Sequence, residues 1–374
     1  MEYITLKDIA VINMGQSPES KTYNEEKKGI PFYQGKSDFG KINPIPRVWC
    51  SNPIKIAEKD DILISVRAPI GDTNIATEKC CIGRGLASIR PLNENINKKY
   101  LYYLLNSKYK ELNKFGTGST FKAITKENLC NLKCAGIPDI KEQIEVVKKM
   151  DNVSQIIEIK KKQLEELSII IKSQFVEMFE SEEYPKKTLN ELTNKITDGS
   201  HNPPTGIAEN EGYMMLSSQN IINNSINYEN VRFLKKEDFE KENLRTNLNR
   251  GDVLLTIVGT VGRTAIITDE TNITLQRSVA VLKPTKEINS IYLVGAINSD
   301  DVIRQLNKGA KGVAQKGIYL NDIKKILIAV PPIELQNQFA EIVKQIDKQK
   351  FESVIKAEKE IEKIQKNIYY KWGR

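Results

Sequence analysis

The sequence contains one histidine, His201, and two tryptophans among 374 residues. It has no run approaching the ~18 consecutive apolar residues that a membrane-spanning helix needs. Its first residues, MEYITLKDIAVINMG, lack the cationic start and apolar core of a secretory signal. The apolar fraction of 40% and the charged fraction of 28% are ordinary for a soluble globular protein. We therefore expect a soluble, cytoplasmic protein without membrane contact.

The five cysteines form no recognisable metal or disulfide pattern. They are Cys50, Cys80, Cys81, Cys130 and Cys134. Their spacing lacks the two C-x2-C pairs of zinc ribbons, and a single histidine adds little to a ligand set. An odd number in a cytosolic chain argues against a disulfide framework. We expect buried free thiols and no metal.

The stretch TDGSHNPPT at 197–205 resembles part of an active site but lacks a required component. Amino-group DNA methyltransferases use Asn-Pro-Pro followed by an aromatic residue that stacks on a flipped base, and here Thr205 follows. A glycine-rich loop after a hydrophobic strand would also be needed for S-adenosylmethionine. The nearest candidate, 115–118, follows the polar stretch KYKELNK. Methyl transfer by this chain is therefore not expected.

Other catalytic motifs are also incomplete. Pro138-Asp139 with Glu158-Ile159-Lys160 imitates a nuclease metal site, but Glu158 and Lys160 fall in a predicted helix, where residues two apart point to different faces. No Walker A lysine loop is present, which argues against ATP hydrolysis. We expect no catalytic residues and no cofactor bound by this chain.

The sequence contains a two-fold internal repeat with an offset of roughly 190 residues. Residues 60–91 and 251–284 share an order of Asp, apolar run, Gly, second apolar run, Arg, third apolar run and Pro. Further matches join 97–107 to 289–299, and IPDIKEQ at 137–143 to VPPIELQ at 330–336. A solenoid needs at least three units, so a two-fold repeat predicts two similar domains. The length of 374 residues agrees with this number.

Each copy ends in a long segment with helical periodicity. Neither Pro nor Gly occurs between about Ile140 and Glu182, and the second segment runs from about Ile333 to Trp372. A helix of ~40 residues spans ~60 Å, so its apolar stripe needs a partner. We expect the two helices to pair as a coiled coil, with each helix packing only on its own domain as the alternative. The residues expected to pair are Ile157, Leu164, Ile171, Ile346, Ile361 and Ile368.

The duplicated half, the Pro-Pro-Ile-x-x-Gln start of a long helix and the TDGSHNPPT stretch together resemble the specificity subunit of type I restriction–modification systems. Asp139 departs from the proline found at Pro332. The resemblance implies an α+β fold with two mixed α/β target recognition domains, joined and spaced by two long antiparallel helices. The implied boundaries are 1–137 for the first recognition domain, 138–184 for the first helix, 185–330 for the second domain and 331–374 for the second helix.

In such a subunit each recognition domain reads one half of a bipartite site on double-stranded DNA, and the helices set the spacing and dock two modification subunits. Those partners carry out adenine methylation with S-adenosylmethionine. Restriction subunits, where present, use ATP and Mg²⁺. The net charge of +8 agrees with a polyanionic partner. The alternative is a coiled-coil scaffold that joins two protein-interaction domains and binds no DNA.

Loops of both domains supply Lys and Arg for phosphates, and Gln, Asn and Arg for base edges. His201, in the loop that opens the second domain, either contacts DNA or shapes the start of that domain. The candidates in the first domain are Tyr33, Gln34, Lys36, Arg67, Arg84 and Lys122, and those in the second are His201, Ser218, Gln219, Asn220, Arg263, Gln276, Arg277, Lys311 and Lys316.

Overall fold

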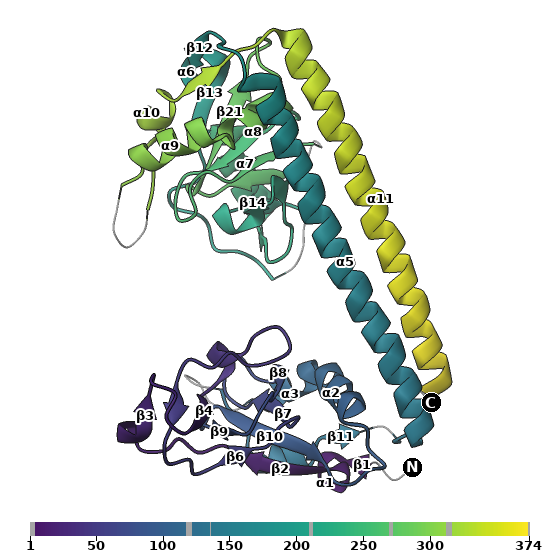
Figure 1. Cartoon of the computed structure of the whole chain (residues 1–374). Helices are drawn as coiled ribbons and strands as arrows, with labels where there is room; N and C mark the ends of the chain where they lie inside the picture. Colours follow the sequence, from purple (N-terminus) through teal and green to yellow (C-terminus); the bar gives the residue numbers. More distant parts are fainter. Residues whose placement is uncertain are drawn as a thin grey trace. The chain divides into compact units, whose positions relative to one another are not determined.

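The structure is a computed structural model that describes residues 4–116, 122–134, 136–208, 212–268, 272–311 and 316–372, with side chains to residue 364 in the last helix. It divides into two compact units, one of residues 1–159 and 356–374 and the other of residues 160–355 (Figure 1). This division falls inside the two long helices, because each helix contributes residues to both units. The domain boundaries expected at the helix ends stay a prediction.

An antiparallel four-stranded sheet forms the centre of the first unit, in the order β2-β10-β7-β8. Of its two inner strands, β10 and β7, the strand β7 is buried along its whole length. A five-stranded sheet, β3-β5-β4-β9-β6, and the pair β1-β11 complete the strands. The strands are β1 (Ile4–Thr5), β2 (Ala10–Met14), β3 (Tyr23–Asn24), β4 (Ile30–Tyr33), β5 (Trp49–Cys50), β6 (Ile56–Ala57), β7 (Ile62–Ser65), β8 (Thr73–Ile75), β9 (Cys80–Ile82), β10 (Leu86–Pro91) and β11 (Lys133–Cys134). The helices are α1 (Leu6–Ile9), α2 (Lys98–Ser107), α3 (Tyr109–Phe115) and α4 (Lys126–Cys130), with short 3-10 turns η1 (Ser20–Thr22) and η2 (Lys36–Asp38).

The second unit repeats this plan with β13-β21-β18-β19 as its four-stranded sheet, joined by β17-β14-β20, β15-β16 and β12-β22. The strands are β12 (Lys186–Thr188), β13 (Thr193–Asp198), β14 (Met214–Leu216), β15 (Ile221–Ile222), β16 (Ser225–Ile226), β17 (Arg232–Phe233), β18 (Val253–Thr256), β19 (Thr264–Ile266), β20 (Ile273–Leu275), β21 (Val279–Pro284) and β22 (Leu327–Ala329). The helices are α6 (Leu189–Leu192), α7 (Lys236–Thr246), α8 (Ser290–Ile297), α9 (Asp300–Gly309) and α10 (Leu320–Ile323), with the 3-10 turn η3 (Ser218–Asn220).

The two units share register as well as strand order. Ala87 of β10 lies opposite Met14 and Ile64, and Ala280 of β21 lies opposite Asp198 and Leu255. Each unit also contains one parallel pairing, β4 with β9 and β14 with β20. The expected duplication is therefore confirmed at the level of backbone hydrogen bonds.

A buried carboxylate in an ion pair explains why the aspartate at the start of the repeat occurs in both copies. Arg90 donates to both carboxylate oxygens of Asp61, over 2.6 and 2.8 Å. In the second unit Lys283 donates to Asp252 over 2.5 Å. Each carboxylate is nearly inaccessible and also accepts a backbone N–H from the turn before its strand. The shared aspartates therefore stabilise the fold.

The long helices are α5 (Ile140–Phe179) and α11 (Ile333–Trp372), of 40 residues each. Their starts agree with the prediction, whereas α5 ends at Phe179 rather than near Glu182. A short link then leads into β12, which begins at Lys186. In the described part of the chain, no helix combines the length and the apolar character needed to cross a membrane.

Within the second unit the last turns of α5 pack against the first turns of α11, so the helices run in opposite directions there (Figure 1). The ring of Phe339 in α11 lies 5.5 Å from the rings of both Phe175 and Phe179. These two rings also contact Tyr292 of α8. A Cβ at Gly295 would lie 2.7 Å from the Phe175 ring, so this glycine permits the close approach of α8.

Most of the residues expected to pair the helices are at least half-buried. Ile346 is 8% exposed. Leu164, Ile171 and Ile361 are half-buried. Ile157 is 41% exposed, and its neighbour Ile156 is half-buried instead. The side chain of Ile368 lies outside the described residues, and the pairing role of the individual residues stays a prediction.

The glutamine of each helix-start signature is fully buried and tethers the helix to the preceding domain. Gln143 accepts the N–H of Asn97, the residue that caps α2. Gln336 accepts the N–H of Asn289, which caps α8 in the same way. Each glutamine amide also donates to two backbone carbonyls. The signature therefore fixes where each long helix begins relative to its own domain.

All five cysteines are free thiols, four of them buried and Cys130 half-buried. Burial raises the pKa of Cys80 to about 12 and those of Cys81 and Cys134 to about 11. A high pKa keeps a thiol protonated and unreactive. These cysteines therefore act as small apolar core residues.

Candidate nucleic-acid interface

A hollow of about 580 Å³, lined by charged, polar and small residues, opens on the first unit where strands β2, β4, β7 and β9 end. Four residues that the sequence analysis named lie around it: Gln34, Lys36, Arg67 and Arg84. Its other lining residues are Ser17, Gly35, Ser37, Ala68, Pro69 and Gly85. Residues separated by up to 68 positions are thus brought into one place, because the strands before them are neighbours.

The parallel pairing of β4 with β9 sets the floor of the hollow. The N–H of Gly83 donates to Tyr33, and the N–H of Gly85 donates to Gln34. A Cβ at Gly85 would lie 2.3 Å from the Gln34 carbonyl oxygen, so only glycine permits this approach. Arg84 stands between the two glycines, and its own N–H donates to the Ser17 hydroxyl over 3.3 Å. Gln34 and Arg84 are held side by side by backbone contacts.

Two carboxylates, Asp38 and Asp72, hold residues of the loop that borders the hollow. Asp38 accepts the N–H groups of Gln34 and Gly35 and a 2.5 Å bond from Arg47, which fixes the loop after β4. Asp72 holds the ammonium of Lys36. The side chains of Arg67 and Arg84 are exposed. Residues that carry ammonium, guanidinium and amide donors therefore line one hollow, a combination suited to phosphate and base-edge acceptors.

The other two candidates of the first unit lie differently. Tyr33 is 1% exposed, and burial raises the pKa of its hydroxyl. It is therefore a core residue with no surface to offer a ligand. Lys122 is exposed, and its carbonyl accepts the N–H of Ala68. This places Lys122 beside the β7–β8 hairpin that borders the hollow.

In the second unit the same strand ends bring several candidates together. Gln276 donates its N–H to Leu216, as expected from the parallel pairing of β14 with β20, and Arg277 donates its N–H to Ser200 in the loop after β13. Ser218 donates its N–H to the Ser278 hydroxyl over 3.0 Å. Arg277 and Gln219 are exposed, and Gln276 and Ser218 are half-buried. Arg277 thus occupies the place that Arg84 has in the first unit.

Three further cationic candidates lie on loops of the second unit. Arg263 is exposed and ends the β18–β19 hairpin, with its guanidinium 3.5 Å from the carbonyl of Ile221. The carbonyl of Lys316 accepts the N–H of Gly259 at the tip of that hairpin, which parallels Lys122. The ammonium of Lys311 lies 6.0 Å from the ring centre of Tyr319. All three side chains are exposed.

Asn220 is 4% exposed and is used inside its own loop. Its side-chain oxygen accepts the N–H and hydroxyl of Ser217, and its amide donates to the carbonyls of Asn227 and Glu229. Each polar atom of this side chain therefore has a partner within the domain. Asn220 is a structural residue of the η3 turn.

His201 contacts a buried carboxylate. Its Nε2 lies 2.9 Å from Asp198, whose other carboxylate oxygen is held by Arg245. Asp198 is 6% exposed, whereas the side chain of His201 is 57% exposed. The stretch 197–205 is thus anchored at its first residues, and the imidazole keeps one face toward solvent.

The sequence analysis missed the carboxylates Asp38 and Asp72, and it included Asp198 only as part of the stretch at 197–205. One signal for Asp72 was available in the repeat, because the residue after the shared glycine is acidic after Gly71 and basic, Arg263, after Gly262.

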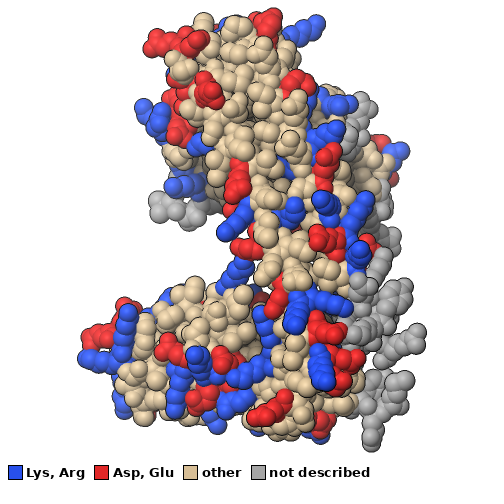
Figure 2. Space-filling model, turned by 45° about the vertical axis from the view of Figure 1, so that its right-hand side comes forward, with Lys and Arg blue, Asp and Glu red and all other residues tan. Residues whose placement is uncertain are grey.

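Charge on the rest of the surface is mixed. On the face drawn in Figure 2, Lys and Arg side chains alternate with Asp and Glu side chains in both units. The positive excess of the chain is not gathered into a single patch on that face. Local arrangements such as the hollow therefore matter more than the overall charge.

Comparison with known proteins identifies the family. The model of the type I restriction modification DNA specificity domain matches twice, at residues 1–168 and 181–363. The putative type I restriction enzyme MjaX specificity subunit of Methanocaldococcus jannaschii is 44% identical over 156 residues, which are 42% of this chain and 36% of that protein. The type I restriction enzyme EcoBI specificity subunit of Escherichia coli is 22% identical over 92% of this chain and 78% of its own length.

Part of the chain is also similar to a protein of solved structure. The HsdS subunit from Thermoanaerobacter tengcongensis is 45% identical over 41% of this chain and 37% of its own, with a TM-score of 0.38. The chain thus matches a little over a third of the MjaX and Thermoanaerobacter proteins. The two family matches together span most of the sequence. The chain belongs to the family of type I restriction–modification specificity subunits, with two specificity domains.

Proposed function

We propose that this chain is the DNA-binding specificity subunit of a type I restriction–modification complex. Each recognition domain reads one half of a bipartite DNA site, and the two long helices set the distance between the half-sites and dock two modification subunits. Adenine methylation is carried out by those subunits with S-adenosylmethionine. Where restriction subunits join the complex, they use ATP and Mg²⁺.

The hollow of the first unit is the observation that supports this function best. Lys36, Arg67 and Arg84 surround it together with the amide of Gln34. Arginine and lysine pair with guanine O6 and N7, and glutamine pairs with adenine N6 and N7. The same cations also suit phosphate oxygens, which position a protein on the duplex.

The duplication supports the assignment of one half-site to each domain. Both units have the same sheet register, but the side chains at the strand ends differ. Gln34 and Lys36 follow β4 in the first unit, whereas Ser217 and Gln219 stand at the matching distance from β14 in the second. Two domains that share a backbone arrangement but differ in the side chains at these strand ends are suited to bind two different DNA sequences.

Sequencing of methylated bases in the host, with and without this gene, tests the proposal. We expect a bipartite motif with methylated adenine in the host that has the gene and the loss of that motif on deletion. Unchanged methylation after deletion would contradict the proposal. DNA binding by the complex with its modification subunit should also weaken steeply with salt, because phosphate neutralisation releases counterions. A protein-interaction scaffold would show no such dependence.

A further inference from the structure

Asp72 carries an unusual carboxylate beside Lys36, one of the residues that line the hollow of the first unit. One oxygen, Oδ1, accepts a hydrogen bond from the ammonium of Lys36. The other oxygen, Oδ2, is buried and has no hydrogen-bond partner; no other buried side-chain nitrogen or oxygen of the described residues lacks one. The side chains of Lys36 and Asp72 are 45% and 24% exposed, and water screens an ion pair of this exposure, so the pair adds little to stability. The structure therefore retains a cation–carboxylate pair where the fold gains little from it.

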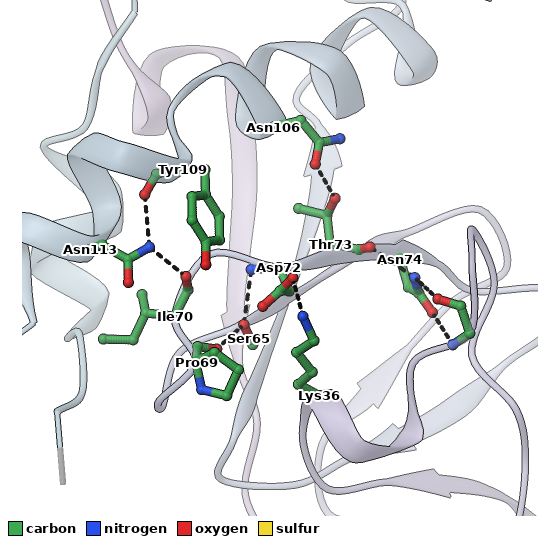
Figure 3. A network of polar contacts seen from close by, with 11 residues as sticks. Lys36, Ser65, Pro69, Ile70, Asp72, Thr73, Asn74, Asn106, Tyr109 and Asn113 are labelled. Atoms are coloured by element: carbon green, nitrogen blue, oxygen red, sulfur yellow. Dashed lines mark hydrogen bonds and ion pairs between the residues drawn. The ribbon is translucent and has the colours of Figure 1, made fainter. Parts of the chain in front are cut away.

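The backbone around Asp72 is held firmly (Figure 3). The Ser65 hydroxyl accepts the Asp72 N–H over 3.0 Å and donates to the Pro69 carbonyl over 2.7 Å. From the neighbouring helices, Asn113 donates to the carbonyl of Ile70, and Asn106 accepts from Thr73. These contacts hold the backbone on both sides of Asp72, so its carboxylate binds the longer and more flexible Lys36 side chain from a fixed position.

The second unit has the same hairpin with the opposite charge. The hydroxyl of Thr256 accepts the N–H of Arg263 and donates to the carbonyl of Thr260, as Ser65 does in the first unit. Thr264 contacts Asn298, as Thr73 contacts Asn106. Because the frame is retained and the side chain changes from Asp72 to Arg263, the fold does not require a carboxylate here. The residue is free to differ with the half-site.

We infer that Asp72 is a positioning residue for sequence reading, which holds the Lys36 ammonium at the hollow so that its remaining N–H groups donate to the acceptor edge of one guanine in the first half-site. An ammonium has three donors, of which one goes to Asp72. Guanine presents two adjacent acceptors in the major groove, O6 and N7. The tether also opposes the movement of Lys36 to a phosphate, because that movement would break its hydrogen bond to Asp72.

This inference rests on the proposed function, and a test separates the two. The full-length chain is purified with its modification subunit, and binding is measured to duplexes that carry the methylated motif or a single base-pair change at each position. The half-site read by the first unit is the one that stays constant when residues 185–330 are exchanged. The variants are Asp72→Asn, which keeps shape and removes charge, and Lys36→Met, which removes the donor and keeps the stem.

The expected result is a change at one position. Both variants lose on the order of tenfold or more of the preference for one G·C pair in the first half-site, and preferences in the second half-site stay as they were. In Asp72→Asn the released Lys36 can reach phosphate, so binding to non-specific DNA is equal to or tighter than that of the wild type. In Lys36→Met non-specific binding weakens slightly.

Asp61→Asn is the matched control, because Asp61 is a buried, paired aspartate of the same unit whose counterpart Asp252 occurs in the second copy. It should lower the melting temperature and weaken binding to all duplexes by the same factor. Unchanged preferences in both Asp72→Asn and Lys36→Met would overturn the inference, as would a uniform loss like that of Asp61→Asn. A wild-type complex that prefers no bipartite motif would instead contradict the proposed function.

Discussion

Replacing Gln336 by leucine tests how the long helix α11 is attached to the second domain. Gln336 is fully buried. Its amide oxygen accepts the N–H of Asn289 over 2.8 Å, and its amide nitrogen donates to the carbonyls of Pro331 and Glu287 over 2.9 and 3.2 Å. Leucine has a similar volume, so the variant removes the hydrogen bonds and leaves little empty space.

The magnitude follows from which partners can be hydrated. Glu287 is exposed, so water can replace the lost bond to its carbonyl, whereas Pro331 is buried and Asn289 is half-buried. An unsatisfied buried polar group costs ~1–3 kcal/mol. With two such groups and a partial gain from burying an apolar side chain, we expect Gln336→Leu to lower the free energy of unfolding by about 2–4 kcal/mol.

Urea unfolding followed by circular dichroism measures this difference. Gln338→Leu is the matched control, because Gln338 is exposed two residues further along the same helix. Such surface substitutions change stability by about ±0.5 kcal/mol. Gln143→Leu should reproduce the large effect in the first unit. Equal midpoints for Gln336→Leu and Gln338→Leu would refute the reasoning.

Two further predictions concern packing and protonation. Gly199→Ala should strongly destabilise the second unit, because the added Cβ would lie 1.9 Å from a backbone carbonyl oxygen. Gly136→Ala is the control and should be close to neutral in the same urea-unfolding measurement, because its Cβ would meet no atom within 4 Å. Burial raises the pKa of the Cys80 thiol to about 12 in the folded chain, above its unfolded value of ~8.5. The thiol therefore ionises first in the unfolded chain, so its contribution to the free energy of unfolding is fully present below pH ~8.5 and is lost as the pH rises toward 12. Between pH 8.5 and 10.5 the unfolding free energy of wild type should therefore fall faster than that of Cys80→Ala, and parallel curves would contradict this assignment.

The long helices and the repeat could be predicted from the sequence because both depend on local or periodic patterns. The starts of α5 and α11 follow from Pro138 and Pro332 and from the change in composition after them. The seven-residue apolar repeat predicted a buried position for Ile157, but this side chain is 41% exposed. A strict heptad drifts on an ideal helix, so the buried face shifts by one residue over a long segment.

The candidate site could be predicted only in part. Gln34, Lys36, Arg67 and Arg84 were chosen as loop residues after strands, and strand adjacency then brings them together. Tyr33 was misplaced because it is the last residue of β4, where its ring points into the core. Side-chain partners such as Asp72 lie 36 positions from Lys36 and leave no local signal.

The same limit applies to the signature glutamines. The motif at 137–143 and 330–336 was recognised, but its physical role was not. The residues that the two glutamines hold are 46 and 47 positions away in the sequence. Only the folded chain shows that this motif ties each long helix to the cap of α2 or α8.

The central claim, two independent readers of one split site, is tested most directly by exchanging one of them. Residues 185–330 are replaced by the corresponding domain of another specificity subunit, and the methylated motif of the host is sequenced. The account predicts that one half-site changes and that the other half-site and the gap between them are retained. A change in both half-sites together, or an unchanged motif, would contradict it.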